Sequence, residues 1–119
     1  MLLNGEGRII NISSIIANTG FNGLSVYASS KSALIGFTKS LSRELGKAEI
    51  TVNAICPGYM QTEMTSRLNK DKLETIKRRS PMKKLIKPKD IIGILIYLLS
   101  SEAKLITGSS FTIDAGSTA

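Results

Sequence analysis

Residues 11–39 read NISSIIANTGFNGLSVYASSKSALIGFTK, and they join an apolar run to a helical pattern. The run begins upstream, where Ile9, Ile10 and Ile12 surround Asn11, a composition typical of a buried parallel strand. After Gly23, apolar residues return at steps of three and four, which predicts a helix over residues 26–46. A strand followed by a crossover helix is the repeating unit of parallel α/β sheets, so this stretch predicts an α/β fold.

The helix over residues 26–46 has predictable ends and a predictable buried face. Ser25 is expected to cap its start, and Gly46 is expected to end it. An apolar stripe on this helix is predicted to pack on the sheet: Leu34, Phe37, Leu41 and Leu45. Residues 14–24, which contain two glycines, are expected to form a loop before the helix.

The remaining elements complete a strand and helix alternation. Strands are predicted over residues 8–13, 50–56 and 109–113, with the second strand ended by Pro57 and Gly58. Helices are predicted near residues 71–79 and after Pro88. The buried face of the last helix is expected to consist of five residues: Ile91, Ile92, Leu95, Leu98 and Leu99. The sequence therefore predicts three parallel strands of a partial doubly wound sheet with right-handed crossovers.

Tyr27 and Lys31 are four residues apart, so they share one face of the predicted helix. A nearby ammonium group favours the ionised form of a phenol, which suits the pair to proton transfer. Ser14 follows the first strand, and a strand end can meet a helix face around one substrate oxygen. Taken alone, the Y-x-x-x-K spacing also fits a solvated helix face without a function.

Four ordered blocks carry a resemblance to a known family: GRIINISS, YASSK, ITVNAICPGYMQTEM and ITGSSFTIDAG. Over nearly all its length the chain resembles the C-terminal half of the short-chain dehydrogenases/reductases, most closely the 3-oxoacyl-acyl-carrier-protein reductase type of fatty acid biosynthesis. The resemblance implies a Rossmann-like sheet and reversible hydride transfer between NADP(H), or NAD(H), and a carbonyl or alcohol. It also implies a homo-oligomer, because in the family the helix over residues 26–46 often forms a subunit interface, although its small residues equally fit an exposed face. The single cysteine separately fits a reducing cytoplasm.

The resemblance also implies roles for individual residues. Ser14, rather than Ser13, would polarise the substrate carbonyl, Tyr27 would transfer the proton, and Lys31 would assist Tyr27 and bind the nicotinamide ribose. Ser13 would instead line the pocket or satisfy local backbone groups. Three further residues match the segment that contacts the nicotinamide end of the cofactor in relatives, besides Tyr27 and Lys31: Pro57, Gly58 and Thr62. The asparagine of the T-V-N-A block, Asn53, matches a structural position that bonds backbone groups.

The phosphate-binding part of a dinucleotide site is missing from the sequence. Gly5 and Gly7 have the first spacing of G-x-G-x-x-G, but Ile10 stands at the third glycine position. At 119 residues the chain has about half the length of a complete enzyme of the resembled family. We therefore expect an exposed edge on the strand over residues 8–13 and a tendency to aggregate or pair with another chain. A monodisperse monomer with slow amide exchange in residues 9–12 would contradict this expectation.

Positive charge accumulates in residues 59–89, which the resemblance implies to be the substrate-covering lid. Ten of the 16 basic residues lie there: Arg67, Lys70, Lys72, Lys77, Arg78, Arg79, Lys83, Lys84, Lys87 and Lys89. Such a surface can attract coenzyme A, a phosphorylated carrier or an acidic acyl-carrier protein. It can equally be a solvated lysine-rich face. Without an aromatic platform or a nucleic-acid motif, the net charge of +7 predicts only non-specific binding to nucleic acid.

Composition excludes several classes of site. The single Cys56 cannot form an intramolecular disulfide, and it is interpreted as a small apolar residue at a strand end. With no histidine, serine–histidine triads and imidazole metal sites are unavailable, and no metal site is predicted. No apolar run approaches the roughly 18 residues of a membrane span, so no membrane partner is expected. Two functions remain open: an oxidoreductase that needs the missing half, and a non-catalytic remnant or interaction module.

Overall fold

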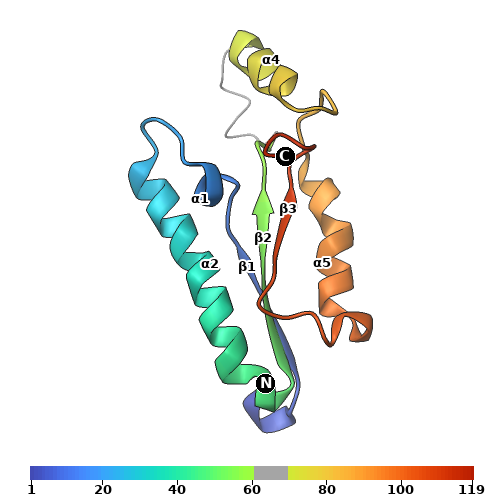
Figure 1. Ribbon diagram of the computed structural model, residues 1–119. Coiled ribbons are helices and arrows are strands. Elements are labelled where there is room, and N and C mark those ends of the chain that lie inside the picture. Colours follow the sequence, from blue (N-terminus) through green and yellow to red (C-terminus); the bar gives the residue numbers. More distant parts are fainter. Residues whose placement is uncertain (61–69) are drawn as a thin grey trace.

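The computed structural model describes residues 1–60 and 70–119, and it contains one parallel sheet. The strands are β1 (Gly7–Ile12), β2 (Ile50–Pro57) and β3 (Ser110–Ile113), in the order β1-β2-β3 (Figure 1). Every residue of the central strand β2 is buried, whereas β1 and β3 are partly exposed. The predicted α/β fold with three parallel strands is confirmed, and β2 extends one residue beyond its predicted end to include Pro57.

Helices lie on both sides of this sheet, as in a doubly wound fold. They are α1 (Ile16–Thr19), α2 (Ser25–Leu45), α4 (Lys70–Arg79) and α5 (Ile92–Leu99). Figure 1 shows α2 along one face of the sheet, α5 along the other, and α4 beyond the end at which β2 finishes. The predicted loop over residues 14–24 is wrong in part, because it contains the single helical turn α1. Among the described residues, no helix is long and apolar enough to span a bilayer.

The predicted end of α2 at Gly46 is confirmed, because Gly46 directly follows the last helical residue, whereas the predicted N-cap Ser25 is wrong. Ser25 is the first helical residue rather than the cap, and its carbonyl accepts a hydrogen bond of 2.9 Å from the Ser29 hydroxyl. Gly46 keeps right-handed helical geometry and begins a 3-10 helix, Gly46–Ala48. The left-handed turn falls instead on Glu49, at φ 55°, because the chain must reverse directly before Ile50 begins β2.

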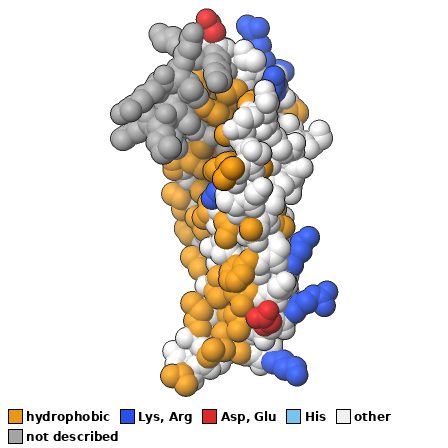
Figure 2. Space-filling model, turned by 90° about the vertical axis from the view of Figure 1, so that its left-hand side faces the viewer, with side chains coloured by type: hydrophobic (Ala, Val, Ile, Leu, Met, Phe, Trp, Pro, Cys, Tyr) orange, Lys and Arg blue, Asp and Glu red, His pale blue; other side chains and the backbone are white. Residues whose placement is uncertain are grey.

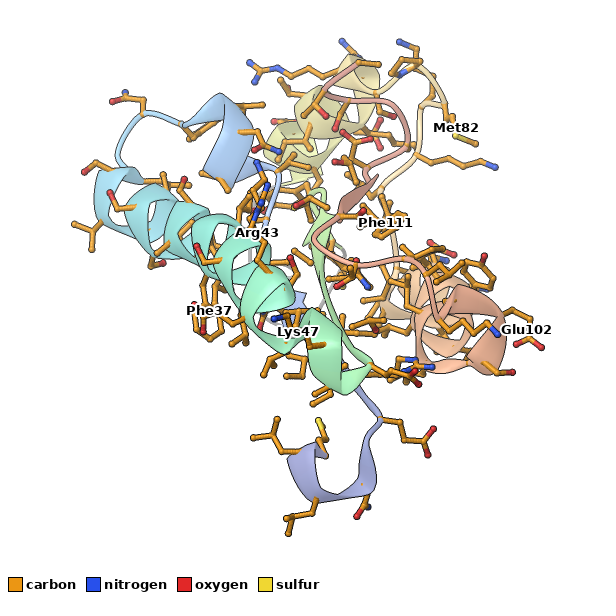
Figure 3. The ribbon with its side chains drawn as sticks, turned by 60° about the horizontal axis from the view of Figure 1, so that its bottom comes forward. Phe37, Arg43, Lys47, Met82, Glu102 and Phe111 are labelled. Atoms are coloured by element: carbon orange, nitrogen blue, oxygen red, sulfur yellow. The ribbon has the colours of Figure 1, made fainter. Side chains whose placement is uncertain are left out.

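The buried face of α2 is rotated from the predicted stripe. Phe37 is 52% exposed and points away from the sheet (Figure 3), whereas Thr38 is completely buried. The Thr38 hydroxyl accepts a bond of 2.9 Å from the Asn11 side-chain amide and donates one of 2.7 Å to the Leu34 carbonyl. Because the half-buried amide of Asn11 on β1 needs a partner, the helix turns a threonine rather than a phenylalanine inward. The prediction that Phe37 packs on the sheet is therefore wrong.

The last helix also buries a different set of residues from the predicted one. Leu98 packs with Ile55 of β2 in the core, and Ile94 and Leu95 pack against them. Ile92 and Leu99, which were predicted to be buried, are exposed. Because α5 reads IGILIYLL and is apolar on every side, periodicity alone does not select its inner face. Pro88 lies in the first turn as predicted, within a 3-10 helix, Pro88–Ile91, that leads into α5.

Apolar side chains collect on the outer face of α2 and along the free edge of β1. Figure 2 shows them as a nearly continuous band on this side of the molecule. Val26 and Phe37 contribute from α2, Ile12 from β1, and Leu2 and Leu3 from the segment before β1. Within the described residues β1 pairs only with β2, so its other edge keeps unpaired backbone groups. The predicted exposed edge is confirmed, whereas the expected aggregation stays a prediction.

Candidate active site

Ser13 and Ser14 directly follow β1, and the two hydroxyl groups have different partners. The Ser13 amide continues the strand ladder by donating to the Ile55 carbonyl at 2.7 Å. Its hydroxyl donates to the Lys31 carbonyl at 2.8 Å, which fastens α2 to the end of β1. Ser13 therefore satisfies a backbone group, as predicted, and its proton is already committed.

The hydroxyl of Ser14 accepts a hydrogen bond, whereas that of Ser13 donates one. Its oxygen accepts a hydrogen bond of 3.2 Å from the Ile16 amide at the start of α1. No group in the described part of the chain accepts the Ser14 hydroxyl proton, so that proton remains available to another oxygen. The two neighbouring serines therefore differ in whether their hydroxyl proton is already used in a hydrogen bond. The spacing from Tyr27 does not make this distinction.

Lys31 lies between the end of β1 and the ring of Tyr27. Its ammonium nitrogen donates to the Ile12 carbonyl at 2.9 Å and lies 5.8 Å from the centroid of the Tyr27 ring. A positive charge at this range is attracted electrostatically to the face of the aromatic ring. One of the three ammonium N–H groups is used by Ile12, which leaves two for a ligand.

The Tyr27 side chain is 42% exposed. Across residues 1–60 and 70–119 its hydroxyl has no hydrogen-bond partner, so it is free to meet a substrate. The pair is held where β1 ends, since Lys31 contacts both Ile12 and Ser13. Ligands of open α/β sheets bind at the carboxyl ends of the strands, which is the position of Ser14, Tyr27 and Lys31.

Cys56 lies beneath this site in β2 and is fully buried. Burial raises the pKa of its thiol, and this effect outweighs the opposing hydrogen bonds with the Ser13 side chain and the Ser14 backbone. The group therefore stays protonated near neutral pH and serves as a small apolar residue, as predicted. No cluster of metal-ligating side chains occurs in the parts of the chain that the structure describes.

The predicted cofactor contacts at the end of β2 are only partly described. Thr62 lies outside the described residues. The Pro57 carbonyl accepts a bond from the Ile15 amide, and the Gly58 amide donates to the Ile113 carbonyl at 2.8 Å. Both backbone groups are thus used within the chain.

Gly58 lies so close to Asp114 that no side chain fits there, and this contact was not predicted from the sequence. A Cβ atom at this position would lie 2.6 Å from the Asp114 Cβ and 2.8 Å from the Asp114 Cα. The Asp114 carboxylate is itself fixed, because it accepts bonds from the Gly116 and Thr118 amides and from the hydroxyl groups of Ser117 and Thr118. An aspartate that precedes glycine, serine and threonine is the available sequence signal for this turn.

We expect Gly58→Ala to destabilise the fold by about 1–3 kcal/mol, because the clash is with backbone that cannot rotate away. Urea unfolding followed by circular dichroism measures the change. Gly36→Ala is the matched control: a Cβ there meets nothing within 4 Å, and alanine favours the α2 helix. Equal stability of Gly58→Ala and the wild type would show that the contact with Asp114 carries no strain.

Comparisons with known proteins agree with this fold and geometry. A family described as enoyl-(acyl carrier protein) reductase matches residues 1–118. The 3-oxoacyl-[acyl-carrier-protein] reductase of Rickettsia felis is 41% identical over 116 residues, which cover 98% of this chain and 48% of that protein. Nodulation protein G of Azospirillum brasilense is 43% identical, with coverages of 98% and 47%.

Solved structures give the same relationship. A protein from Thermus thermophilus superposes with a TM-score of 0.91 at 34% identity, covering 98% of this chain and 51% of that one. A variant of a Serratia marcescens short-chain dehydrogenase/reductase superposes with a TM-score of 0.86 at 40% identity, covering 94% and 46%. The chain spans about half the length of the curated relatives it matches. It belongs to the short-chain dehydrogenase/reductase family, and it corresponds to the C-terminal half of that fold.

Proposed function

We propose that this chain supplies the catalytic half of an NAD(P)-dependent oxidoreductase that interconverts a 3-oxoacyl thioester and its 3-hydroxy form. The observation that carries this proposal is the position of Lys31, bonded to the Ile12 carbonyl at the strand end and lying 5.8 Å from the Tyr27 ring. Family membership supports the reaction class, and the names of the Rickettsia relatives support the substrate class. The same names support a role in fatty acid biosynthesis, and a cytoplasmic location is part of this proposal.

In the proposed reaction Tyr27 gives a proton to the carbonyl oxygen, or removes it from the alcohol in the reverse direction. Lys31 stabilises the negative charge that develops on the phenol oxygen when the proton leaves. The uncommitted proton of Ser14 bonds the same substrate oxygen and orients it toward Tyr27. The bound nicotinamide supplies the hydride.

The residues present fit one end of a nicotinamide cofactor. Lys31 has two ammonium N–H groups left for ribose hydroxyl groups, and it lies at the ligand-binding end of the sheet. The sequence contains no glycine-rich turn to hold the pyrophosphate, a group that normally provides much of the binding.

For this reason we expect the isolated chain to show no saturable NADPH or NADH binding in the micromolar range. Isothermal titration calorimetry with the purified 119-residue chain measures this directly. Because the missing phosphate contacts are the cause, adenosine 2′,5′-bisphosphate should bind no better. A micromolar dissociation constant for NADPH would show that the chain holds the cofactor without another half.

The alternative proposal is a non-catalytic remnant or interaction module. Its support is the free β1 edge together with the exposed apolar face of α2. The same surfaces are also those that a second half or another copy in a homo-oligomer would cover, so they do not favour this alternative over the enzyme.

The experiment that tests the enzyme proposal restores the other half. In the chimera, the unmatched N-terminal half of the Rickettsia felis relative is placed before Met1. We expect the chimera to oxidise NADPH when a 3-oxoacyl thioester is added, and the isolated chain to be inactive. A folded chimera that binds NADPH but reduces no 3-oxoacyl substrate would refute the proposal.

A further inference from the structure

The chain turns directly after β3, and one carboxylate holds this turn together. Residues 114–118 are called the β3 turn below. Oδ1 of Asp114 accepts a hydrogen bond of 2.8 Å from the Gly116 amide. Oδ2 accepts three more, from the Thr118 amide at 2.9 Å, the Thr118 hydroxyl at 2.6 Å and the Ser117 hydroxyl at 3.0 Å. Four donors therefore converge on one side chain, which suits an ionised carboxylate because that group only accepts hydrogen bonds.

The backbone of the β3 turn is unfavourable without these bonds. Ala115 and Gly116 both lie at positive φ, at 56° and 81°. A left-handed conformation is costly for alanine, and it persists only where the surrounding contacts determine it. Burial alone would raise the pKa of the Asp114 carboxyl, but the hydrogen bonds outweigh burial and lower the pKa below its ordinary value. The carboxyl is therefore ionised near neutral pH and able to hold the turn.

On one side the β3 turn contacts the segment that follows β2. A Cβ atom on Gly58 would lie 2.8 Å from the Asp114 Cα, so the two backbones touch. The Pro57 carbonyl accepts a bond of 3.1 Å from the amide of Ile15, the residue next to Ser14. The segment that the β3 turn supports thus lies at the candidate active site.

On its other side the β3 turn contacts the segment that follows α4. A Cβ atom on Gly116 would lie 3.2 Å from two ring carbons of Pro81. The Met82 amide donates a hydrogen bond of 3.4 Å to the Ala115 carbonyl. Figure 1 shows α4 and the chain after it beside the end of the chain marked C, at the end of the sheet where β2 finishes. One turn therefore supports two segments that are far apart in the sequence.

We propose that Asp114 is a positioning residue for the reaction, which acts by holding the β3 turn against both of these segments. The proposal rests on the proposed function, with the nicotinamide next to Pro57 and Gly58 and the substrate covered by the segment after α4. Four donors already occupy the carboxylate, so Asp114 acts through the turn rather than by touching the substrate. Because the two segments share one support, loss of the carboxylate shifts both, and cofactor and substrate then bind less tightly.

Hydrogen exchange in the 119-residue chain, followed residue by residue by NMR, tests the support without any activity. In Asp114→Ala the amides of Gly58 and Met82, which bond to the chain next to Asp114, should exchange at least about tenfold faster. The Ala54 amide bonds to Ser109 at the other end of β3 and should keep its rate. Faster exchange at all three amides would show a general loss of stability and would overturn the proposal.

In the chimera, Asp114→Ala should raise the Michaelis constants for NADPH and for the 3-oxoacyl thioester by about tenfold each, with turnover falling less than about threefold. A loss of folded protein alone would lower the apparent turnover and leave both Michaelis constants unchanged. Asp114→Asn keeps one accepting oxygen and should raise both constants by about threefold, so it carries the test if the alanine variant does not fold. The matched control is Thr107→Val, which removes a bond to the Val52 amide at the opposite end of β3 and should leave both constants within about twofold of the wild type.

Unchanged exchange at Gly58 and Met82 in a folded Asp114 variant would overturn the proposal. Unchanged Michaelis constants would overturn it too, and so would an equal rise in Thr107→Val. Failure of the proposed function is distinguished separately. If the wild-type chimera binds NADPH but reduces no 3-oxoacyl substrate, the exchange result still stands, and Asp114→Ala should still raise the NADPH dissociation constant by about tenfold.

Discussion

Replacing Tyr27 with phenylalanine is expected to lower turnover of the chimera by about 10²–10⁴-fold, the range typical of a lost general acid. The substitution removes only the hydroxyl group, which has no partner in the described parts of the chain. The ring that faces Lys31 remains, so the fold and the contact at 5.8 Å are expected to persist. NADPH oxidation at saturating 3-oxoacyl thioester measures the effect, with the Michaelis constant changing much less than the rate.

Tyr97→Phe is the control for this prediction. Tyr97 lies on α5, across the sheet from α2, and is 44% exposed, close to the exposure of Tyr27. Tyr97→Phe, which also removes only a hydroxyl group, should therefore leave the turnover of the chimera unchanged. If Tyr27→Phe kept its rate within about threefold of the wild type, proton transfer by Tyr27 would be ruled out.

The second large expected effect is a loss of stability when Asn53 is replaced, because Asn53 links β2 to the segment that precedes β3. Asn53 is 1% exposed, and its side chain donates to the Ile106 carbonyl at 2.7 Å and accepts from the Ser109 amide at 3.2 Å. Asn53→Ala removes this partner from the backbone groups of two half-buried residues, Ile106 and Ser109, and opens a cavity at a buried position. We expect a loss of about 2–5 kcal/mol, from the two unpaired groups together with the missing atoms.

Chemical denaturation of the 119-residue chain measures this loss. Asn22→Ala is the matched control, because Asn22 is exposed and its side chain has no bond among the described residues. It should change the free energy of unfolding by less than about 0.5 kcal/mol. A similar small change for Asn53→Ala would mean that Asn53 does not hold the start of β3.

The sequence predicted the strands well because their apolar runs are short, continuous and bounded by glycine or proline. It placed the faces of the helices less well. Phe37 was expected inside, but the amide of Asn11 on another element draws Thr38 inward instead. Ile92 and Leu99 were expected inside a helix that is apolar all round, and only the position of Ile55 in the sheet decides which side is buried.

The candidate site was predictable in part. The spacing of Tyr27 and Lys31 placed them together, and the structure brings them to the end of β1. The choice between Ser13 and Ser14 depends on which hydroxyl proton is already committed, and that depends on the docking of α2 against β1. No pattern in a single sequence records such a long-range contact. The role of Gly58 was likewise hidden, because Asp114 lies 56 residues away along the chain.

The central claim is that Ser14, Tyr27 and Lys31 direct hydride transfer to a carbonyl once the other half of the fold is present. The most direct measurement gives the chimera NADPH that carries deuterium at both hydrogen positions of the nicotinamide C4 and examines the product by mass spectrometry. We predict one deuterium on the former carbonyl carbon of the 3-hydroxy product, and we expect the Tyr27→Phe variant to form this labelled product at least about a hundredfold more slowly. A folded, cofactor-binding chimera that yields unlabelled product, or none, would contradict the claim.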